Sequence, residues 1–292
     1  METSTLFTVN DAIIEGARSL DDSSVADPRR TASLLMSHLL GCDQARLIMR
    51  SAEPLTRERR EQFFDLVRRR AGGEPAQYIT GHQEFFGLDL AVTPDVLIPR
   101  PETEFLVEQA IRIAGSVTVR PPLIADVGTG SGCIAIALAV NIASARIVAT
   151  DLSAAALAVA RANAERHGVA GRIKFEEGDL IEPLKKFGSE LFDIIAANLP
   201  YVPSANPGLL AREVREHEPA LALFAGDDGL ECLRRLLRDA PAVLKPGGRM
   251  VVEIGYNQID QTTRLLDPKE WELVEVINDL QVIPRTLILR RK

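Results

Sequence analysis

The segment Asn198-Leu199-Pro200-Tyr201 combines groups that can hold a planar amino group at the end of a strand. It follows residues 192–197, an apolar run typical of a buried strand. The Asn198 side-chain oxygen and the Leu199 carbonyl can each accept one N–H of an NH2 group, which turns the nitrogen lone pair toward a methyl donor. The Tyr201 ring can lie flat against the planar group. The same residue types also occur in ordinary strand-to-turn junctions.

A glycine-rich turn precedes this segment in the chain. Gly128-Thr129-Gly130-Ser131-Gly132 lies between an apolar strand-like run and an apolar helix-like run, which is typical of the opening of a doubly wound α/β domain. Glycines let the backbone approach a ligand, and a helix N-terminus adds amide donors. The spacing differs from the dinucleotide fingerprint, which has its third glycine one position later.

Two further strand ends carry carboxylates. Asp151 follows the run 145–150, and a carboxylate about 20 residues beyond the glycines can accept hydrogen bonds from both ribose hydroxyls of an adenosine-containing cofactor. Residues 173–176 lead to Asp179 and Leu180, which can flank an adenine ring. Four strand-end signals in this order are a much stronger indication of a cofactor site than the glycines alone.

The chain resembles the HemK-type peptide chain release factor glutamine methyltransferases over nearly its whole length. The motifs that carry the resemblance, besides those above, are residues 74–81 (EPAQYITG), 84–88 (EFFGL), 96–104 (VLIPRPETE), 218–221 (EPAL) and 226–230 (GDDGL). The resemblance implies methyl transfer from S-adenosylmethionine to the side-chain amide of the glutamine in the Gly-Gly-Gln loop of class 1 release factors, in support of translation termination. It also implies a seven-stranded Rossmann-like class I methyltransferase sheet with a reversed edge.

Position in the motifs predicts the role of each site residue. Gly128, Thr129, Gly130, Ser131 and Gly132 are expected around the methionine part of the cofactor, Asp151 at the ribose, Asp179 and Leu180 at the adenine, Asn198 at both cofactor and substrate, and Leu199, Pro200 and Tyr201 at the substrate. Arg100 and Glu102 either contact the substrate or orient the helix after Pro101. No metal ligand is expected.

Two positions depart from the family pattern. Leu199 stands where the family usually has Pro, but the required acceptor is a carbonyl, which Leu also supplies, and Pro200 still favours an extended residue 199. Val282 stands where the family commonly has Gly, which bears on the shape of its loop rather than on the chemistry.

The predicted domains are a helical substrate-recognition domain (1–80), a β-hairpin linker (81–96) and a methyltransferase domain (97–292). Thr8 to Asp11 resembles a helix capping box, and Asp27-Pro28 predicts an N-cap followed by proline at the first helical position. Residues 245–248 (KPGG) predict a turn.

Composition and charge narrow the class of protein. The 292 residues are 46% hydrophobic, with no run long enough to span a membrane and no signal-peptide pattern, so we expect a cytoplasmic monomer. The net charge is −7, and acidic residues interleave with the arginines of 57–70. A salt-bridged helix face is therefore favoured there over a nucleic-acid groove, and direct nucleic-acid binding is not expected.

Four alternatives are weighed against this prediction. An amino-methyltransferase acting on a nucleic-acid base would use the same Asn-x-Pro-Tyr site but would also need basic surface to hold the extruded base. A glutamine methyltransferase of a ribosomal protein shares most of the motifs. A Rossmann-like dehydrogenase is disfavoured by the glycine spacing, and a catalytically silent binding module stays open.

Overall fold

The computed structural model describes residues 7–116, 120–188, 191–206, 208 and 210–292. Its α-helices within these ranges are α1 (Val9–Asp22), α2 (Pro28–Leu40), α3 (Gln44–Met49), α4 (Arg57–Ala71), α5 (Ala76–Thr80), α6 (Thr103–Ala114), α7 (Cys133–Asn141), α8 (Ala154–Arg166), α9 (Arg212–His217), α10 (Glu231–Asp239) and α11 (Ile259–Leu265). The strands are β1 (His82–Phe85), β2 (Leu88–Ala91), β3 (Leu123–Val127), β4 (Arg146–Asp151), β5 (Ile173–Glu177), β6 (Phe192–Ala197), β7 (Leu244–Glu253), β8 (Trp271–Asn278) and β9 (Pro284–Arg291).

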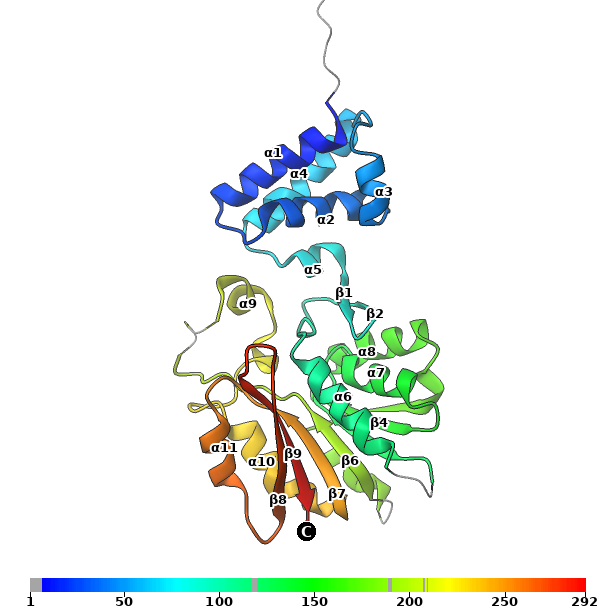
Figure 1. The fold of residues 1–292 in the computed structure, drawn as a ribbon, viewed down its shortest axis with the longest axis vertical. Helices are drawn as coiled ribbons and strands as arrows, with labels where there is room; N and C mark the ends of the chain where they lie inside the picture. The colour runs from blue at the N-terminus through cyan, green and yellow to red at the C-terminus, as the bar shows by residue number, and fades with distance from the viewer. Residues whose placement is uncertain (1–6, 117–119, 189–190, 207, 209) are drawn as a thin grey trace, which may run out of the picture. The chain divides into compact units, whose positions relative to one another are not determined.

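Two compact units make up the chain (Figure 1). The first, here called the helical unit, comprises Met1–Gly81 together with Ala211–His217. The second, here called the catalytic unit, comprises His82–Leu210 together with Glu218–Lys292. Helix α9 therefore belongs to the helical unit, although it lies between β6 and β7 in the sequence.

The helical unit is built around amphipathic helices with defined ends. The predicted capping box at the start of α1 is confirmed, because Thr8 accepts from the Asp11 N–H and the Asp11 carboxylate accepts from the Thr8 N–H. Gly16 allows α1 to approach α4 closely, since a Cβ there would lie 2.9 Å from the Phe63 ring. The predicted N-cap at Asp27, followed by Pro28 as the first residue of α2, is confirmed, although the Asp27 backbone is left-handed (φ 48°) and its side chain makes no capping hydrogen bond.

The predicted β-hairpin is confirmed in strands β1 and β2. Phe85 pairs with Leu88, so the connection has two residues, Phe86 and Gly87, with φ of 53° and 75°. This is the type I′ geometry, whose twist matches that of the flanking strands. The Phe86 N–H donates to the Glu104 carboxylate on α6 at 2.9 Å, which ties the hairpin to the catalytic unit.

The catalytic unit contains the predicted seven-stranded sheet, in the order β5-β4-β3-β6-β7-β9-β8. Strands β3 to β7 are parallel, and β9 runs antiparallel to both β7 and β8. The reversed strand thus lies next to the edge strand β8. From β3 the chain order runs outward on one side to β4 and β5 and on the other to β6 and β7, so a crevice forms where β3 and β6 end.

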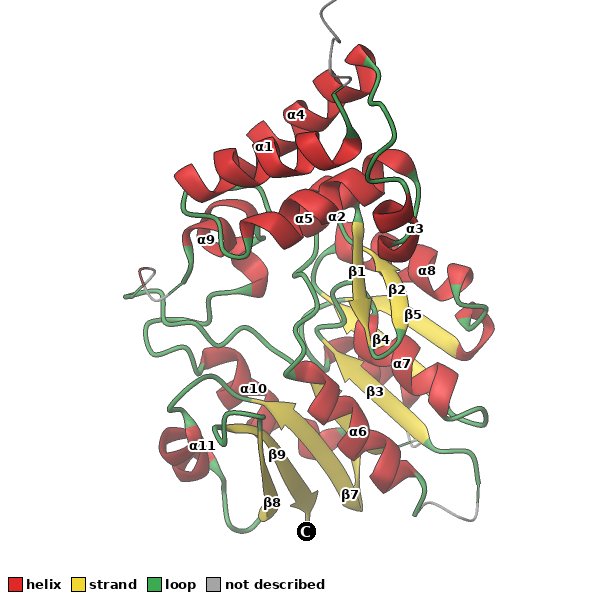
Figure 2. Cartoon of the chain, turned by 45° about the horizontal axis from the view of Figure 1, so that its top comes forward, coloured by secondary structure: helices red, strands yellow, loops and turns green. Residues whose placement is uncertain are grey.

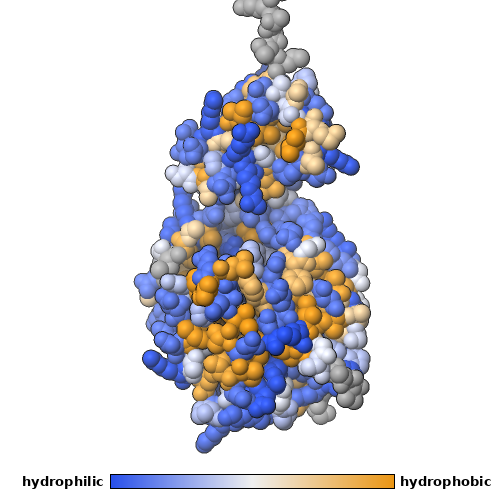
Figure 3. Space-filling model, viewed as in Figure 1, coloured by the Kyte–Doolittle hydropathy of each residue, from blue (hydrophilic) through white to orange (hydrophobic). Residues whose placement is uncertain are grey.

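Helices cover both faces of this sheet (Figure 2). Buried residues of α6, α7 and α8 form one core with the sheet, and those of α10 form the other. Alternate residues of β3 point to opposite cores: Ile124 joins the first, and Ala125 and Val127 join the second. On the face seen in Figure 3, the apolar residues of the catalytic unit are separated by hydrophilic ones.

The turn predicted at residues 245–248 lies inside strand β7. Pairing with β6 jumps from Phe192↔Leu244 to Ile194↔Arg249, so the intervening residues bulge out of the ladder. Gly247 has φ 77°, which permits the sharp bend without ending the strand.

Candidate active site

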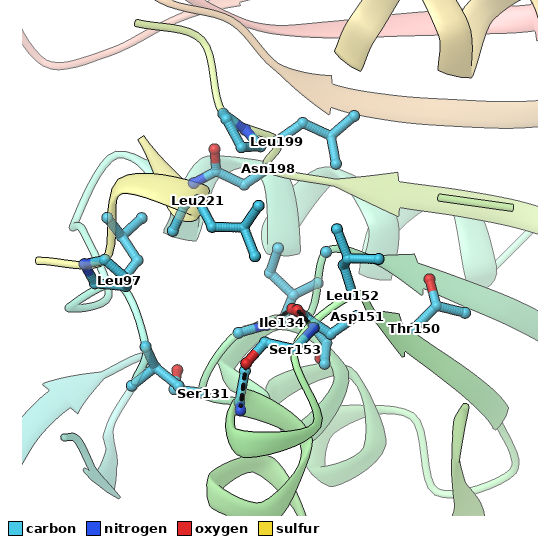
Figure 4. A pocket seen from close by; sticks show the side chains of 18 of the residues that line it. Leu97, Ser131, Ile134, Thr150, Asp151, Leu152, Ser153, Asn198, Leu199 and Leu221 are labelled. Carbon is cyan, nitrogen blue, oxygen red and sulfur yellow. Dashed lines mark hydrogen bonds between the residues drawn. The ribbon is translucent and has the colours of Figure 1, made fainter. Parts of the chain in front are cut away.

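A cleft of about 1080 Å³, counting its open mouth, lies at the carboxyl ends of β3, β4 and β6. Figure 4 shows Asn198 and Leu199 on one side of the cleft, and Asp151 and Ser153 opposite them. Leu97 and Leu221 line the cleft with apolar side chains. The topology explains this place, because ligands of open α/β sheets bind where the strand order reverses.

The glycine turn after β3 is held in shape by backbone bonds. Gly128, Gly130 and Gly132 have φ of 77°, 55° and 84°, a region that side chains with a Cβ disfavour. The Gly128 and Thr129 N–H groups both donate to the Thr150 carbonyl at 2.9 Å. The turn is thereby fixed to the end of β4, with its amides beside the cleft.

The five residues from Gly128 to Gly132 have two structural roles. Gly128, Thr129, Gly130 and Ser131 line the cleft, as the sequence predicted for the cofactor site. Gly132 is not among the described lining residues; a Cβ there would lie 3.1 Å from the Ala160 Cβ on α8. Gly132, the N-cap of α7, therefore permits the start of α7 to pack closely against α8.

Asp126, the fourth residue of β3, organises the turn from below. It is fully buried, and its Oδ2 accepts from the Thr129 hydroxyl at 2.6 Å and the Ala135 N–H at 3.1 Å. Its Oδ1 has no hydrogen-bond partner. Burial raises the pKa of Asp126 to about 7, and the nearby charge of Asp151 adds to the shift. The sequence analysis did not single out this residue, although an acid just before a glycine turn is a readable signal.

Asp151, the last residue of β4, connects the glycine turn to the N-cap of α8. Its Oδ2 accepts from the Gly130 N–H at 2.8 Å and its Oδ1 from the Ser153 N–H at 2.9 Å. A carboxylate has about four acceptor positions, so each oxygen keeps one for a further donor. The carboxylate therefore holds the glycine turn in place and can also accept two further hydrogen bonds.

Asp179 and Leu180 reach the cleft from the segment after β5. Asp179 forms an ion pair with Arg235 of α10. The Leu180 carbonyl accepts from the Thr150 hydroxyl at 3.0 Å, and its backbone is left-handed (φ 47°). The structure thus brings both residues to the edge of the cleft where the sequence placed them.

The Asn198 side chain follows β6 directly and is connected to two buried polar groups. Its Nδ2 donates to the Thr103 hydroxyl at 2.9 Å, and that hydroxyl donates to the Glu253 carboxylate at 2.7 Å. Thr103 is 1% exposed and Glu253 is 4% exposed. Burial raises the pKa of Glu253 to about 7. Sequence analysis identified Asn198 but missed both partners.

The rest of the Asn-x-Pro-Tyr segment combines a buried Leu199 with half-buried Pro200 and Tyr201. Leu199 and Pro200 line the cleft, and the Leu199 side chain is only 5% exposed, packed against Gly128. Tyr201 is not among the described lining residues, and burial raises the pKa of its hydroxyl. Its carbonyl accepts from the Gln258 side chain at 2.9 Å, which fixes the main chain of the segment.

The segment 98–100 is held by Glu218, a buried acid after α9. Its Oε2 accepts from the Ile98 N–H at 3.1 Å, and its Oε1 pairs with Arg100. Arg100 and Pro99 line the cleft beside this bond. Arg100 and Glu102 were expected either to contact the substrate or to orient the helix after Pro101. Arg100 instead forms an ion pair with Glu218 in the wall of the cleft. Glu102 is at the N-cap of α6, but its side chain caps no helix N–H.

Within the described ranges, no group of three or more His, Cys, Asp and Glu side chains is placed to hold a metal ion. Over the same part of the chain, no helix is long and apolar enough to cross a membrane.

Comparison with known proteins gives two matching family models. The model of the PrmC N-terminal domain matches residues 11–81, and a methyltransferase domain model matches residues 124–279. A crystal structure of a methyltransferase from Pyrococcus furiosus is 19% identical and covers 70% of this chain and 90% of its own, with a TM-score of 0.51. That likeness shows the fold of the catalytic unit.

Relatives named release factor glutamine methyltransferase match along nearly the whole chain. The protein of Koribacter versatilis is 38% identical over 284 residues, which is 97% of this chain and 99% of that relative. The protein of Nitratidesulfovibrio vulgaris is 40% identical over 286 residues, 97% of this chain and 95% of that relative. The glycine turn, the cleft and these matches together show that the chain belongs to the release factor glutamine methyltransferase family.

Proposed function

We propose that this protein transfers a methyl group from S-adenosylmethionine to the side-chain amide nitrogen of the glutamine in the Gly-Gly-Gln motif of class 1 peptide chain release factors. The observation that carries the proposal is the position of the Asn198 amide, which opens on the same cleft as the glycine turn. Membership of the family supports the same donor and the same substrate class.

The residues present fit the cofactor. The turn from Gly128 to Ser131 offers backbone without bulky side chains, and Asp151 keeps two acceptor positions, which match two ribose hydroxyls. We propose Asp179 and Leu180 for the adenine end, since both line the cleft. When bound, S-adenosylmethionine supplies an electrophilic methyl group on a positively charged sulfur.

The protein's task is to make an amide nitrogen reactive. The lone pair of an amide nitrogen is delocalised into the carbonyl, so the nitrogen attacks a methyl group poorly. It attacks better when the NH2 group is held out of that conjugation or when the charge that develops on the nitrogen is stabilised. The Asn198 side-chain oxygen and the Leu199 carbonyl can each accept one N–H of the target. Fixed acceptors of this kind orient the nitrogen and stabilise the positive charge that grows on it during transfer.

No general base is required by this scheme. The nitrogen of an N-methylated amide cation is very acidic, so its proton can pass to water once transfer is complete. The two buried acids beside the site, Asp126 and Glu253, already accept hydrogen bonds from the hydroxyls of Thr129 and Thr103. They hold the site in shape and need not exchange the proton.

Recognition of a release factor needs surface outside the cleft, because a Gly-Gly-Gln tripeptide has few side-chain handles. We propose that the helical unit supplies it and raises the effective concentration of the loop at Asn198. Ile48 and Met49 of α3 are 72% and 84% exposed, which makes them suitable for a test. Replacing both by Ser should slow transfer to the intact factor more than transfer to a Gly-Gly-Gln peptide. Equal slowing on both substrates would contradict this role.

An experiment on the substrate tests the main proposal. The mass of release factors from cells with and without this protein should differ by one methyl group, confined to the Gly-Gly-Gln peptide. Purified protein with S-adenosylmethionine should restore that difference, and Asn198→Ala should not. A methyl group found instead on a ribosomal protein or on a nucleic-acid base would identify one of the alternative substrates. The net charge of −7 favours a protein substrate over a nucleic acid, and we propose a cytoplasmic monomer.

A further inference from the structure

A buried chain of two hydrogen bonds ends on the Asn198 amide. Asn198 Nδ2 donates to Thr103 Oγ1 at 2.9 Å, and Thr103 Oγ1 donates to Glu253 Oε2 at 2.7 Å. Resting on the function proposed above, we propose that Thr103 and Glu253 are positioning residues that determine which end of the Asn198 amide faces the cleft.

The Thr103 hydroxyl has a single proton to donate. An ionised carboxylate only accepts hydrogen bonds, so the hydroxyl donates that proton in its bond to Glu253. The hydroxyl then has only lone pairs to offer Asn198, which must present its NH2 end to it. The Oδ1 end is left for the cleft. Both partners are almost fully buried, so water does not compete for these bonds.

The orientation matters because the two ends of an Asn side chain have nearly the same shape and opposite hydrogen-bonding character. With Oδ1 toward the cleft, the side chain accepts an N–H of the target amide. With the amide turned over, it presents its own N–H groups and has no acceptor for the target. A side chain of the right type in the right place would then fail to bind the reacting nitrogen.

Protonation of Glu253 would reverse the chain. A neutral Glu253 can donate to the Thr103 oxygen, which frees the hydroxyl proton for Asn198 Oδ1 and favours the turned amide. Burial holds the pKa of Glu253 at about 7, so this change falls within an accessible pH range. The charged and titratable groups that act on Glu253 or feel its charge are Arg100, Glu102, Cys133, Tyr201 and Arg285.

The test compares Thr103→Val, Thr103→Ser and Glu253→Gln with the wild type. Val has nearly the shape of Thr without the hydroxyl, and Ser keeps the hydroxyl. Single-turnover transfer to a release factor is measured from pH 5.5 to 9, with S-adenosylmethionine affinity by calorimetry. Independently of activity, NMR follows the side-chain amide signal of Asn198, assigned by its loss in Asn198→Ala.

We expect Thr103→Val to slow transfer by about tenfold or more at high pH with cofactor affinity changed less than about twofold, and Thr103→Ser to stay within about threefold. The wild-type rate should fall as the pH decreases through about 7, and Glu253→Gln should remove that fall. The Asn198 amide signal should titrate over the same range in the wild type and not in Glu253→Gln.

Two results would overturn the proposal: a Thr103→Val rate equal to that of Thr103→Ser, or a titration of the Asn198 signal that persists in Glu253→Gln. Should Thr103→Val fail to fold, Glu253→Gln and the amide signal still decide. Absence of transfer by the wild type would refute the proposed substrate, and the NMR titration would still test the positioning.

Discussion

Gly229 lies where the 226–230 segment crosses the Asn-x-Pro-Tyr segment, and it has no room for a side chain. A Cβ there would lie 2.3 Å from the Tyr201 carbonyl oxygen and 3.0 Å from the Pro203 nitrogen, both main-chain atoms. Its φ of 75° is also left-handed. Gly229→Ala should therefore cost ~1–2 kcal/mol for the backbone conformation and a further ~1–3 kcal/mol for the overlap.

Gly247→Ala provides the matched control. Its φ is 77°, and a Cβ there would meet nothing within 4 Å, so it carries the conformational cost without the overlap. By calorimetry, Gly229→Ala should melt at a temperature lower than Gly247→Ala by an additional ~2–12 °C, from ~2–4 °C per kcal/mol in a unit of this size. Because Tyr201 must move, methyl transfer should also fall in Gly229→Ala alone. Equal melting temperatures and equal activities would refute the reasoning.

Three other changes have defined outcomes. Asp151→Ala should weaken S-adenosylmethionine binding measured by calorimetry, because charge-assisted bonds of ~1.5–3 kcal/mol each are lost; unchanged affinity in the folded variant would contradict the ribose assignment. Leu199→Pro should keep methyl transfer, since its carbonyl remains, but lower the melting temperature because a buried side chain is trimmed. Folding raises the pKa of Asp126 from 3.8 to about 7, so its contribution to the free energy of unfolding is complete below about pH 4 and is lost as the pH rises through 7. In urea unfolding, Asp126→Asn should show a smaller loss of stability between pH 5 and pH 8; an equal loss would exclude that contribution.

Local sequence patterns predicted the elements whose signals lie within a few residues. The strand, glycine turn and helix around residues 128–132 and the hairpin belong to this class, because periodicity and turn chemistry determine them. The Asp-Pro pair correctly predicted where α2 begins, but it does not indicate that the Asp27 backbone is left-handed, which leaves the Asp27 side chain without a capping hydrogen bond. The 245–248 turn was merged into β7 because β6 offers partners on both sides of it.

The part of the site that the sequence did not predict consists of pairs of residues far apart in the chain. Thr103 and Glu253 are 150 positions apart, and Ile98 and Glu218 are 120 apart, so only the topology brings them together. Glu253 also ends an apolar strand, where an acid resembles an ordinary strand boundary. Asn198 could be identified from the sequence, whereas Thr103 and Glu253, to which it is connected by hydrogen bonds, could not.

The helical unit is discontinuous in sequence, because it includes the segment Ala211–His217. The chain passes between the two units at residues 81–82, 210–211 and 217–218, and Glu213 of α9 pairs with Arg70 of α4 at 2.5 Å. Removing everything before residue 81 would therefore leave α9 in place without the helices it packs with. The helical unit therefore cannot be exchanged between family members through a single junction. Swapping it requires moving the 211–217 insert as well, and its variation in related enzymes should follow that of the N-terminal helices rather than that of the sheet.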